Sequence, residues 1–204
     1  MKKPFLTVVT RTHDRPEQLI HAHETLRVQT DQDFEHLILV DKVGVGIELA
    51  NQSFDRCKHY VNGTYVYILD DDDEIVDHRF IQDLKELVQE IQYDVVMVRM
   101  SRLGEIYPPN SFWKQPPTLA RIGTPNFIVR APVWKKHIKK FRNPRGGGGG
   151  DFFFITSLFE NEDLTFYWWD RIVTNVYQIG QTVRRRKNAR AQSQVNDLGH
   201  DNSS

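Results

Sequence analysis

The chain has 204 residues, with 27 basic and 27 acidic side chains, and its formal net charge of zero disfavours a protein that coats nucleic acid. Its single cysteine, Cys57, excludes an internal disulfide framework and favours a reducing compartment. No apolar stretch is long enough to cross a bilayer, and the apolar run near residue 5 is too short for a signal peptide. We therefore expect a cytoplasmic protein without a membrane-spanning segment.

The first hundred residues alternate between two kinds of hydrophobic pattern. Strands are expected where β-branched and aromatic residues dominate, at residues 5–10, 34–40, 65–69 and 94–100. Helices are expected at residues 16–28, 47–57 and 77–91, and Asp14 is the expected capping residue of the first. Alternation of this kind predicts a single-domain α/β fold with a mainly parallel central sheet and helices on both faces.

The second half of the chain has weaker periodicity. Residues 103–124 are rich in proline and predict a loop-rich insertion. A short strand at residues 126–130 and a basic helix opened by Pro132 are expected next, followed by five glycines and a helix that Asp151 would cap. Two closing strands are expected, at residues 164–169 and 172–179, on either side of Asp170-Arg171.

Five consecutive carboxylates, Asp70 to Glu74, follow the third expected strand. Like charges at the end of a buried strand repel one another unless a cation offsets them. Carboxylate oxygens suit Mg²⁺ or Mn²⁺, which bridge one or two carboxylates to the phosphates of a substrate. Because Thr12 and Asp41 also follow strands of the same sheet, the pattern predicts a metal-assisted phosphate or diphosphate site. The plainer alternative is an acidic turn that caps the next helix.

Six short motifs follow one another in a recognisable order. They are Thr12-His13-Asp14-Arg15-Pro16, Gln29-Thr30, Val40-Asp41, Ala50-Asn51-Gln52, Leu69-Asp70-Asp71-Asp72-Asp73 and Gly149-Gly150-Asp151. In order and spacing, over about residues 7–159, they resemble the nucleotide-sugar glycosyltransferases of the A-type fold, especially those of glycosyltransferase family two. The resemblance implies a glycosyltransferase domain at residues 1–186, with a nucleotide-sugar-binding half at 1–100 and an acceptor-side half at 101–186. Residues 187–204 are expected to be a mobile polar tail.

The resemblance also implies a reaction and a set of site residues. The reaction would be metal-dependent, inverting and non-processive transfer from a nucleoside-diphosphate sugar, with a UDP-sugar as first choice. The acceptor hydroxyl would belong to a glycan, a lipid-linked sugar, a protein or a nucleic acid. Asp72, together with Asp70, would hold Mn²⁺ or Mg²⁺, and Asp151 would be the general base. The residues expected to bind the donor are Thr12, Asp14, Arg15, Asp41, Asn51, Asp70 and Asp71. Asp73 and Glu74 would instead begin the next helix.

Several alternatives stay open at this stage. Glu160, Glu162 and Asp163 are rival bases, and Lys42 follows Asp41 where the family usually has a second Asp, which leaves the base of the nucleotide open. The basic run Arg184 to Arg186 could fold over a diphosphate. The Gln-x-x-Arg-Trp signature of processive members is absent from the sequence. A nucleotidyltransferase and a nucleotide-sugar-binding module without turnover are the competing functions.

Overall fold

The computed structural model describes residues 3–44 and 46–177. Apart from β4, its first elements alternate as the sequence predicts: β1 (Leu6–Thr12), α1 (Pro16–Arg27), β2 (Phe34–Val40), α2 (Gly46–Cys57), β3 (Tyr65–Ile68), β4 (Asp73–Ile75), α3 (Phe80–Leu87) and β5 (Val95–Arg102). The second half adds β6 (Glu105–Tyr107), η1 (Asn110–Phe112), η2 (Thr124–Asn126), β7 (Phe127–Arg130), α4 (Ala131–His137), η3 (Ile138–Lys140), α5 (Gly150–Phe159) and β8 (Phe166–Val176). None of the helices within these described ranges has the length and hydropathy that a bilayer crossing requires.

One eight-stranded sheet organises the fold, with the order β2-β1-β3-β7-β5-β8-β4 and with β6 paired to β5. The three parallel ladders pair 7, 4 and 7 residues, whereas each of the four antiparallel ladders pairs 3. Most paired residues are therefore in parallel register, and the α/β fold expected from the sequence is confirmed. The carboxyl ends of β1 and β3 lie at the same edge, because Thr12 pairs with Val40 of β2 and Ile68 pairs with Val9 of β1.

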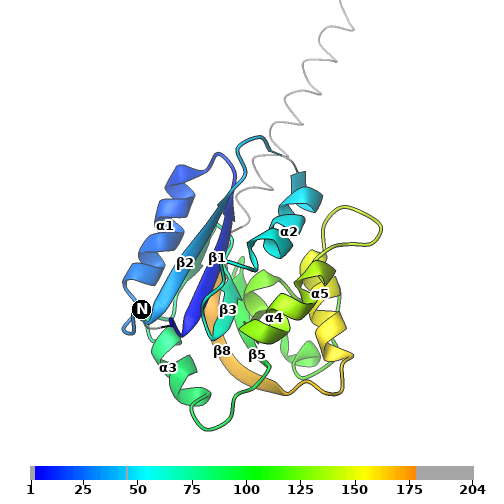
Figure 1. Ribbon diagram of the computed structural model, residues 1–204. Helices are drawn as coiled ribbons and strands as arrows, with labels where there is room; N and C mark the ends of the chain where they lie inside the picture. Colours follow the sequence, from blue (N-terminus) through cyan, green and yellow to red (C-terminus); the bar gives the residue numbers. More distant parts are fainter. Residues whose placement is uncertain (1–2, 45, 178–204) are drawn as a thin grey trace, which may run out of the picture.

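Helices cover both faces of the sheet, and each face has its own hydrophobic core (Figure 1). On one face α2, α4 and α5 bury Phe54, Trp134 and Phe154 against the sheet. On the other face α1 and α3 bury residues such as Leu26 and Phe80. Strands buried on both faces consist of nearly continuous apolar residues, as the sequence of β3 shows.

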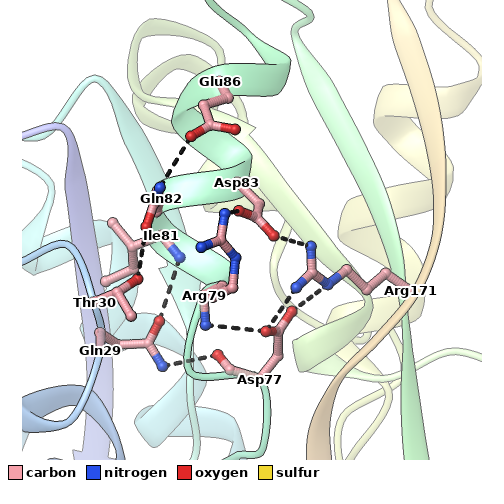
Figure 2. A network of polar contacts seen from close by, with 9 residues as sticks. All are labelled: Gln29, Thr30, Asp77, Arg79, Ile81, Gln82, Asp83, Glu86 and Arg171. Atoms are coloured by element: carbon pink, nitrogen blue, oxygen red, sulfur yellow. Dashed lines mark hydrogen bonds and ion pairs between the residues drawn. The ribbon is translucent and has the colours of Figure 1, made fainter.

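A polar network ties the start of α3 to β8 and to the segment after α1 (Figure 2). Arg171 of β8 forms ion pairs with both Asp77 and Asp83, and the Arg79 guanidinium pairs with Asp83 at 2.8 Å. On the other side, the Thr30 hydroxyl donates a hydrogen bond to Gln82 over 3.0 Å. The network joins elements that are far apart along the chain.

Gln29 explains why this network forms at the first turn of α3. The side chain of Arg79, the N-cap residue of α3, makes no capping hydrogen bond, so the first-turn amides need partners from elsewhere. The Ile81 amide donates to the Gln29 side-chain oxygen at 3.3 Å, and the Gln29 amide group donates to the Asp77 carbonyl at 2.9 Å. The Gln29-Thr30 motif is therefore a structural element that caps a helix 50 residues further along.

Four local expectations are wrong. Asp73 and Glu74 belong to β4 and not to a helix, because β4 pairs with the end of β8 at Val176 and Asn175. Asp14 does not cap α1: the N-cap residue is Arg15, and it makes no side-chain cap. Asp151 does not cap α5 either, because that helix begins before it.

The N-cap residue of α5 is Gly149, with a left-handed φ of 89°, so the helix begins at Gly150 and Asp151 lies inside its first turn. Glycine adopts this φ without steric cost, which allows the N-cap to lie two residues earlier than expected.

The two closing strands expected around Asp170-Arg171 are one continuous strand, β8, within the described residues. Met97 pairs with Trp168 and Arg99 with Ile172, so β8 contains two extra residues at this point and bulges there instead of turning. Both bulged residues have ionic partners: Asp170 binds Arg99 at 2.5 Å, and Arg171 binds the network of α3. The expected polar tail at 187–204 and the basic run Arg184 to Arg186 lie outside the described residues.

Candidate functional site

A largely buried arginine, Arg11, lies at the edge of the sheet where β1 and β3 end. Arg11, in β1, donates to the Asn51 side-chain oxygen at 2.5 Å and binds Asp70 at 3.1 Å. Its guanidinium also stacks on the Phe54 ring, 4.5 Å from the ring centroid. The Arg11 side chain is only 16% exposed. It is therefore a fixed cation that joins β1 to α2 and to the acidic run after β3.

Gly150 brings the first turn of α5 to the same place. A Cβ atom at position 150 would lie 2.7 Å from the Asn51 amide nitrogen and 2.9 Å from the Phe141 ring, so a larger residue would push α5 away. Asn51 is itself buried, with 3% exposure. The close approach of glycine to Asn51 sets the position of Asp151, which follows directly in the helix.

Different aspartates of the acidic run form ion pairs with two different arginines. Asp70 binds Arg11 and also accepts a hydrogen bond from the Thr124 hydroxyl at 3.2 Å. Arg15, at the start of α1, binds Asp71 at 2.5 Å and Asp72 at 3.1 Å. The Asp70 and Asp72 side chains are 29% and 11% exposed, whereas Asp71 is fully buried. Among the four aspartates of the run, Asp70 and Asp72 are therefore the ones that a ligand can reach.

Burial and mutual repulsion disfavour ionisation of all the carboxyls in the acidic run. Burial raises the pKa of Asp71 to about 6, although the Thr12 hydroxyl and Arg15 act in the opposite direction. Burial, together with the charges of Asp70 and Asp72, raises the pKa of Asp73 well above its ordinary value. Clusters of carboxyls with raised pKa values are typical of functional sites.

Asp151 belongs electrostatically to this cluster. Burial raises the pKa of Asp151, the charge of Asp70 raises it further, and the charge of Arg11 lowers it. Its carboxylate accepts a hydrogen bond from the Phe152 amide at 2.9 Å. The rival bases Glu160, Glu162 and Asp163 follow the other end of α5, roughly 15 Å away for a ten-residue helix. Of the four candidates, Asp151 alone lies at the end of α5 that meets Asn51.

A cavity of about 300 Å³ opens beside the acidic run. Asp71 and Asp72 form part of its wall, and the remaining lining residues come from α1 and from the end of the described chain: Glu17, Gln18, His21 and Tyr177. A volume of this size is at the lower end of the range for small-molecule sites. The cavity gives a ligand access to the carboxylates from the side of α1.

Two expected donor-binding residues stand apart from this cluster. The Asp41 carboxylate accepts hydrogen bonds from the amides of Val43 and Gly44, at 3.0 and 2.9 Å, and so shapes the loop after β2. His13 binds the Asp41 carbonyl at 2.8 Å. Asp14 is exposed with a φ of 50°, and its side chain forms no hydrogen bond or ion pair with a described residue. The expected donor-binding roles of Asp14 and Asp41 stay predictions.

The donor set fits a hard divalent cation that shares its ligands with phosphate. No group of three or more His, Cys, Asp or Glu side chains within residues 3–44 and 46–177 is arranged to hold a metal ion. Mg²⁺ and its relatives need only one or two carboxylates when a diphosphate supplies further oxygens. Asp70 and Asp72 offer such oxygens, and the unmatched negative charge around them favours a cation. Arg15 would have to share Asp72 with that cation.

Two residues of the site escaped the sequence-based prediction. Arg11 is a charged residue within the largely buried strand Leu6–Thr12, which is a visible signal of a buried ionic contact. Thr124 gave no signal, because its partner Asp70 lies 54 residues away in a different element. Trp113, in the proline-rich insertion, packs edge-on against Trp168 at 5.1 Å and stacks with Arg99 at 4.3 Å.

Comparison with known proteins shows which solved structures share this fold. The chain matches no family model and no curated protein sequence. Among solved structures, it resembles S. aureus TarS, a glycosyltransferase with an A-type-like fold, with a TM-score of 0.65 and 15% identity over 85% of this chain and 36% of TarS. TarS fragment 1–349 in complex with UDP-GlcNAc gives a TM-score of 0.61, and the complex with UDP gives 0.57, again at 15% identity and 85% coverage. The chain covers 58% and 60% of these two fragments.

The fold resemblance that the motifs suggested is therefore confirmed. At 15% identity it establishes the fold alone, and the chain spans between 36% and 60% of the length of these solved chains. UDP and UDP-GlcNAc are ligands of the TarS fragment.

Proposed function

We propose that the protein is a glycosyltransferase that takes its sugar from a nucleoside-diphosphate donor, with a UDP-sugar as first choice. The observation that supports this function best is the position of Asp70, which follows β3 together with Asp72 and lies close enough to Asp151 to raise its pKa. The fold that holds these carboxylates is shared with a UDP-GlcNAc-binding protein. Ligands of open α/β sheets bind beyond the carboxyl ends of the strands, which is where these carboxylates lie.

A divalent cation at Asp72 and Asp70 would supply Lewis-acid stabilisation of the departing diphosphate. The chain's own residues would do the rest. Arg11 keeps Asp70 in a fixed orientation. Arg15, which would share Asp72 with the cation, would donate its other N–H groups to a phosphate oxygen. Buried Asp71 holds Arg15 close to the site.

Asp151 would accept the proton of the acceptor hydroxyl as that oxygen attacks the anomeric carbon. Burial raises its pKa, which makes the carboxylate a better proton acceptor than an exposed Asp. One displacement assisted by one base would invert the configuration at the anomeric carbon. Metal dependence, inversion and non-processive transfer are all parts of this proposal.

Thermal unfolding with a panel of UDP-, GDP-, dTDP- and CMP-sugars tests the donor. A UDP-sugar at 100 times its Kd should stabilise the protein by about 2.7 kcal/mol, because a ligand that binds only the folded state shifts the folding equilibrium. No shift with any donor, with and without Mn²⁺, would contradict the proposal.

The assignment of the base needs its own variant. Asp151→Asn should bind the donor with wild-type affinity and lose transfer by about 10²-fold to 10⁴-fold, the usual contribution of a general base. Glu160→Gln is the matched control on the far end of α5, and it should transfer at the wild-type rate. If the two variants exchanged these behaviours, the base would be Glu160.

A further inference from the structure

The segment before α5 carries a concentration of positive charge that the proposed chemistry does not use. Residues 106–150 contain nine Lys and Arg side chains and no Asp or Glu. Three of the nine have internal partners: Arg130 pairs with Asp94 at 2.6 Å, Lys135 donates to the Val61 carbonyl at 2.8 Å, and Arg121 stacks over a ring.

Five of the remaining cations form what we call the basic surface, on α4, η3 and the loop that leads to α5. All five side chains are exposed, and none forms an ion pair with a residue in the described part of the chain. They are Lys136, Lys139, Lys140, Arg142 and Arg145.

The basic surface repels further positive charge. His137 lies within it, and burial followed by the charges of Lys136, Lys140 and Lys139 lowers the pKa of its imidazole. Glu48 of α2 borders the surface, with its carboxylate 3.7 Å from where a Cβ of Gly146 would be. One carboxylate against five cations leaves a strongly positive potential.

The surface is attached to the candidate site by a buried anchor. Phe141, between Lys140 and Arg142 in the chain, packs against Gly150 and lies 4.9 Å from the Phe54 ring that supports Arg11. The Asn143 side chain donates to the Gly148 carbonyl at 2.9 Å and so stabilises the glycine-rich loop. A ligand held on the basic surface would therefore lie beside the turn that carries Asp151.

The surroundings of these cations indicate which ligand they suit. Within residues 131–145, which carry the basic surface, the large apolar residues Val133, Trp134, Ile138 and Phe141 are all buried. This stretch thus offers no apolar face to enter a bilayer, as interfacial helices do, and no aromatic ring on which a base could stack. The basic surface therefore suits a ligand with regularly spaced negative charges, which it would bind through electrostatic attraction alone.

We propose that the basic surface binds a flexible phosphate-bearing polymer and presents it to Asp151 as the acceptor. The role as acceptor site rests on the glycosyltransferase function proposed above, whereas the binding of the polyanion does not. Lysine and arginine bind phosphate strongly, and a row of them along one segment follows a linear chain of phosphates.

Binding of fluorescently labelled inorganic polyphosphate, followed by anisotropy, tests the surface. The double variant Lys139→Glu/Lys140→Glu should bind at least about tenfold more weakly than the wild type, with a shallower dependence on salt, because two phosphate contacts are lost. The double variant Arg27→Glu/Lys114→Glu changes the net charge equally at other places and should bind within about threefold of the wild type. Equal weakening by both double variants would overturn the proposal.

Further measurements separate the possible ligands. Arg142→Ser/Arg145→Ser, which removes charge without reversing it, should also weaken polyphosphate binding. Vesicles containing phosphatidylserine should compete poorly with polyphosphate for the wild type; strong competition would replace the polymer by a membrane surface. Both surface variants should keep wild-type affinity for UDP with Mn²⁺, so that a failure of donor binding in the wild type counts against the proposed function and not against the surface.

Discussion

Two clusters of arginine and carboxylate side chains lie on the same sheet and differ in how their charges match. In the network at α3, Asp77 and Asp83 face two guanidiniums, those of Arg79 and Arg171 (Figure 2). Burial alone would raise the pKa of Asp83, but hydrogen bonds and charges from Arg171 and Arg79 hold it below its ordinary range. The candidate site contains two arginines, Arg11 and Arg15, and five carboxyls: Asp70, Asp71, Asp72, Asp73 and Asp151.

The direction of the pKa shifts distinguishes a structural cluster from a binding site. Where charges match, ionisation is favoured in the folded protein and the pairs join distant elements. Where negative charge exceeds positive charge, burial and repulsion raise the pKa values of Asp71 and Asp73, and the fold holds the carboxyls together at a cost. A cation or a partner that binds there would remove part of that cost.

Removing the central cation of the matched cluster should have the largest effect on stability. Arg171→Met leaves Asp77 and Asp83 without their main partner and should lower the free energy of unfolding by about 2–4 kcal/mol, because a partly buried charge loses its pair. Urea denaturation measures the change. Arg79→Met, which removes only an exposed pair between residues four apart in α3, should cost less than about 0.5 kcal/mol. If both variants changed the free energy of unfolding by less than about 0.5 kcal/mol, the network would not contribute to stability as we expect.

The unmatched cluster should respond in the opposite direction. Asp72→Asn removes one of the repelling carboxylates while Arg15 keeps its pair with Asp71. We expect the free energy of unfolding without ligand to stay constant or to rise by less than about 1 kcal/mol, the usual range for partly exposed charges. A loss of several kcal/mol in urea denaturation would show that Asp72 is a structural residue.

The smallest effect concerns the pH dependence of the matched cluster. A carboxyl whose pKa is lowered by folding contributes stability above its unfolded pKa, and this contribution is lost as the pH falls through the lower folded value. Asp83 should therefore stabilise the wild type relative to Asp83→Asn at pH 7, by less than about 1 kcal/mol, and the difference should shrink below about pH 4. Urea denaturation of both proteins at pH 7 and pH 3.5 measures it; a difference that grew in acid would contradict the assignment.

Local sequence patterns identified the elements and the acidic run but not their long-range partners. The alternation of apolar runs predicted the strands and helices of the first half, and five carboxylates in a row marked one edge of the sheet. Asp73 and Glu74 form a strand only because β8, some 100 residues later, supplies the partner. Asp170-Arg171 has the composition of a turn, yet its two charges bind partners on different elements and the strand continues.

The same limit applies to the candidate site. Gly149-Gly150-Asp151 was visible as a motif, but the reason for the glycine is its contact with Asn51, which no local pattern contains. Arg11 joins residues 40 and 59 positions away and became meaningful only once β1, α2 and the end of β3 were placed together.

Calorimetric titration with UDP, with and without Mn²⁺, tests most directly whether the unmatched carboxylates form a site for a cation and a diphosphate. The wild type should bind UDP at least about tenfold more tightly with Mn²⁺, a difference of about 1.4 kcal/mol, and Asp72→Asn should lose this dependence. Arg79→Met, altered in the matched cluster, should titrate like the wild type. UDP binding that is independent of Mn²⁺, or unchanged in Asp72→Asn, would contradict the account.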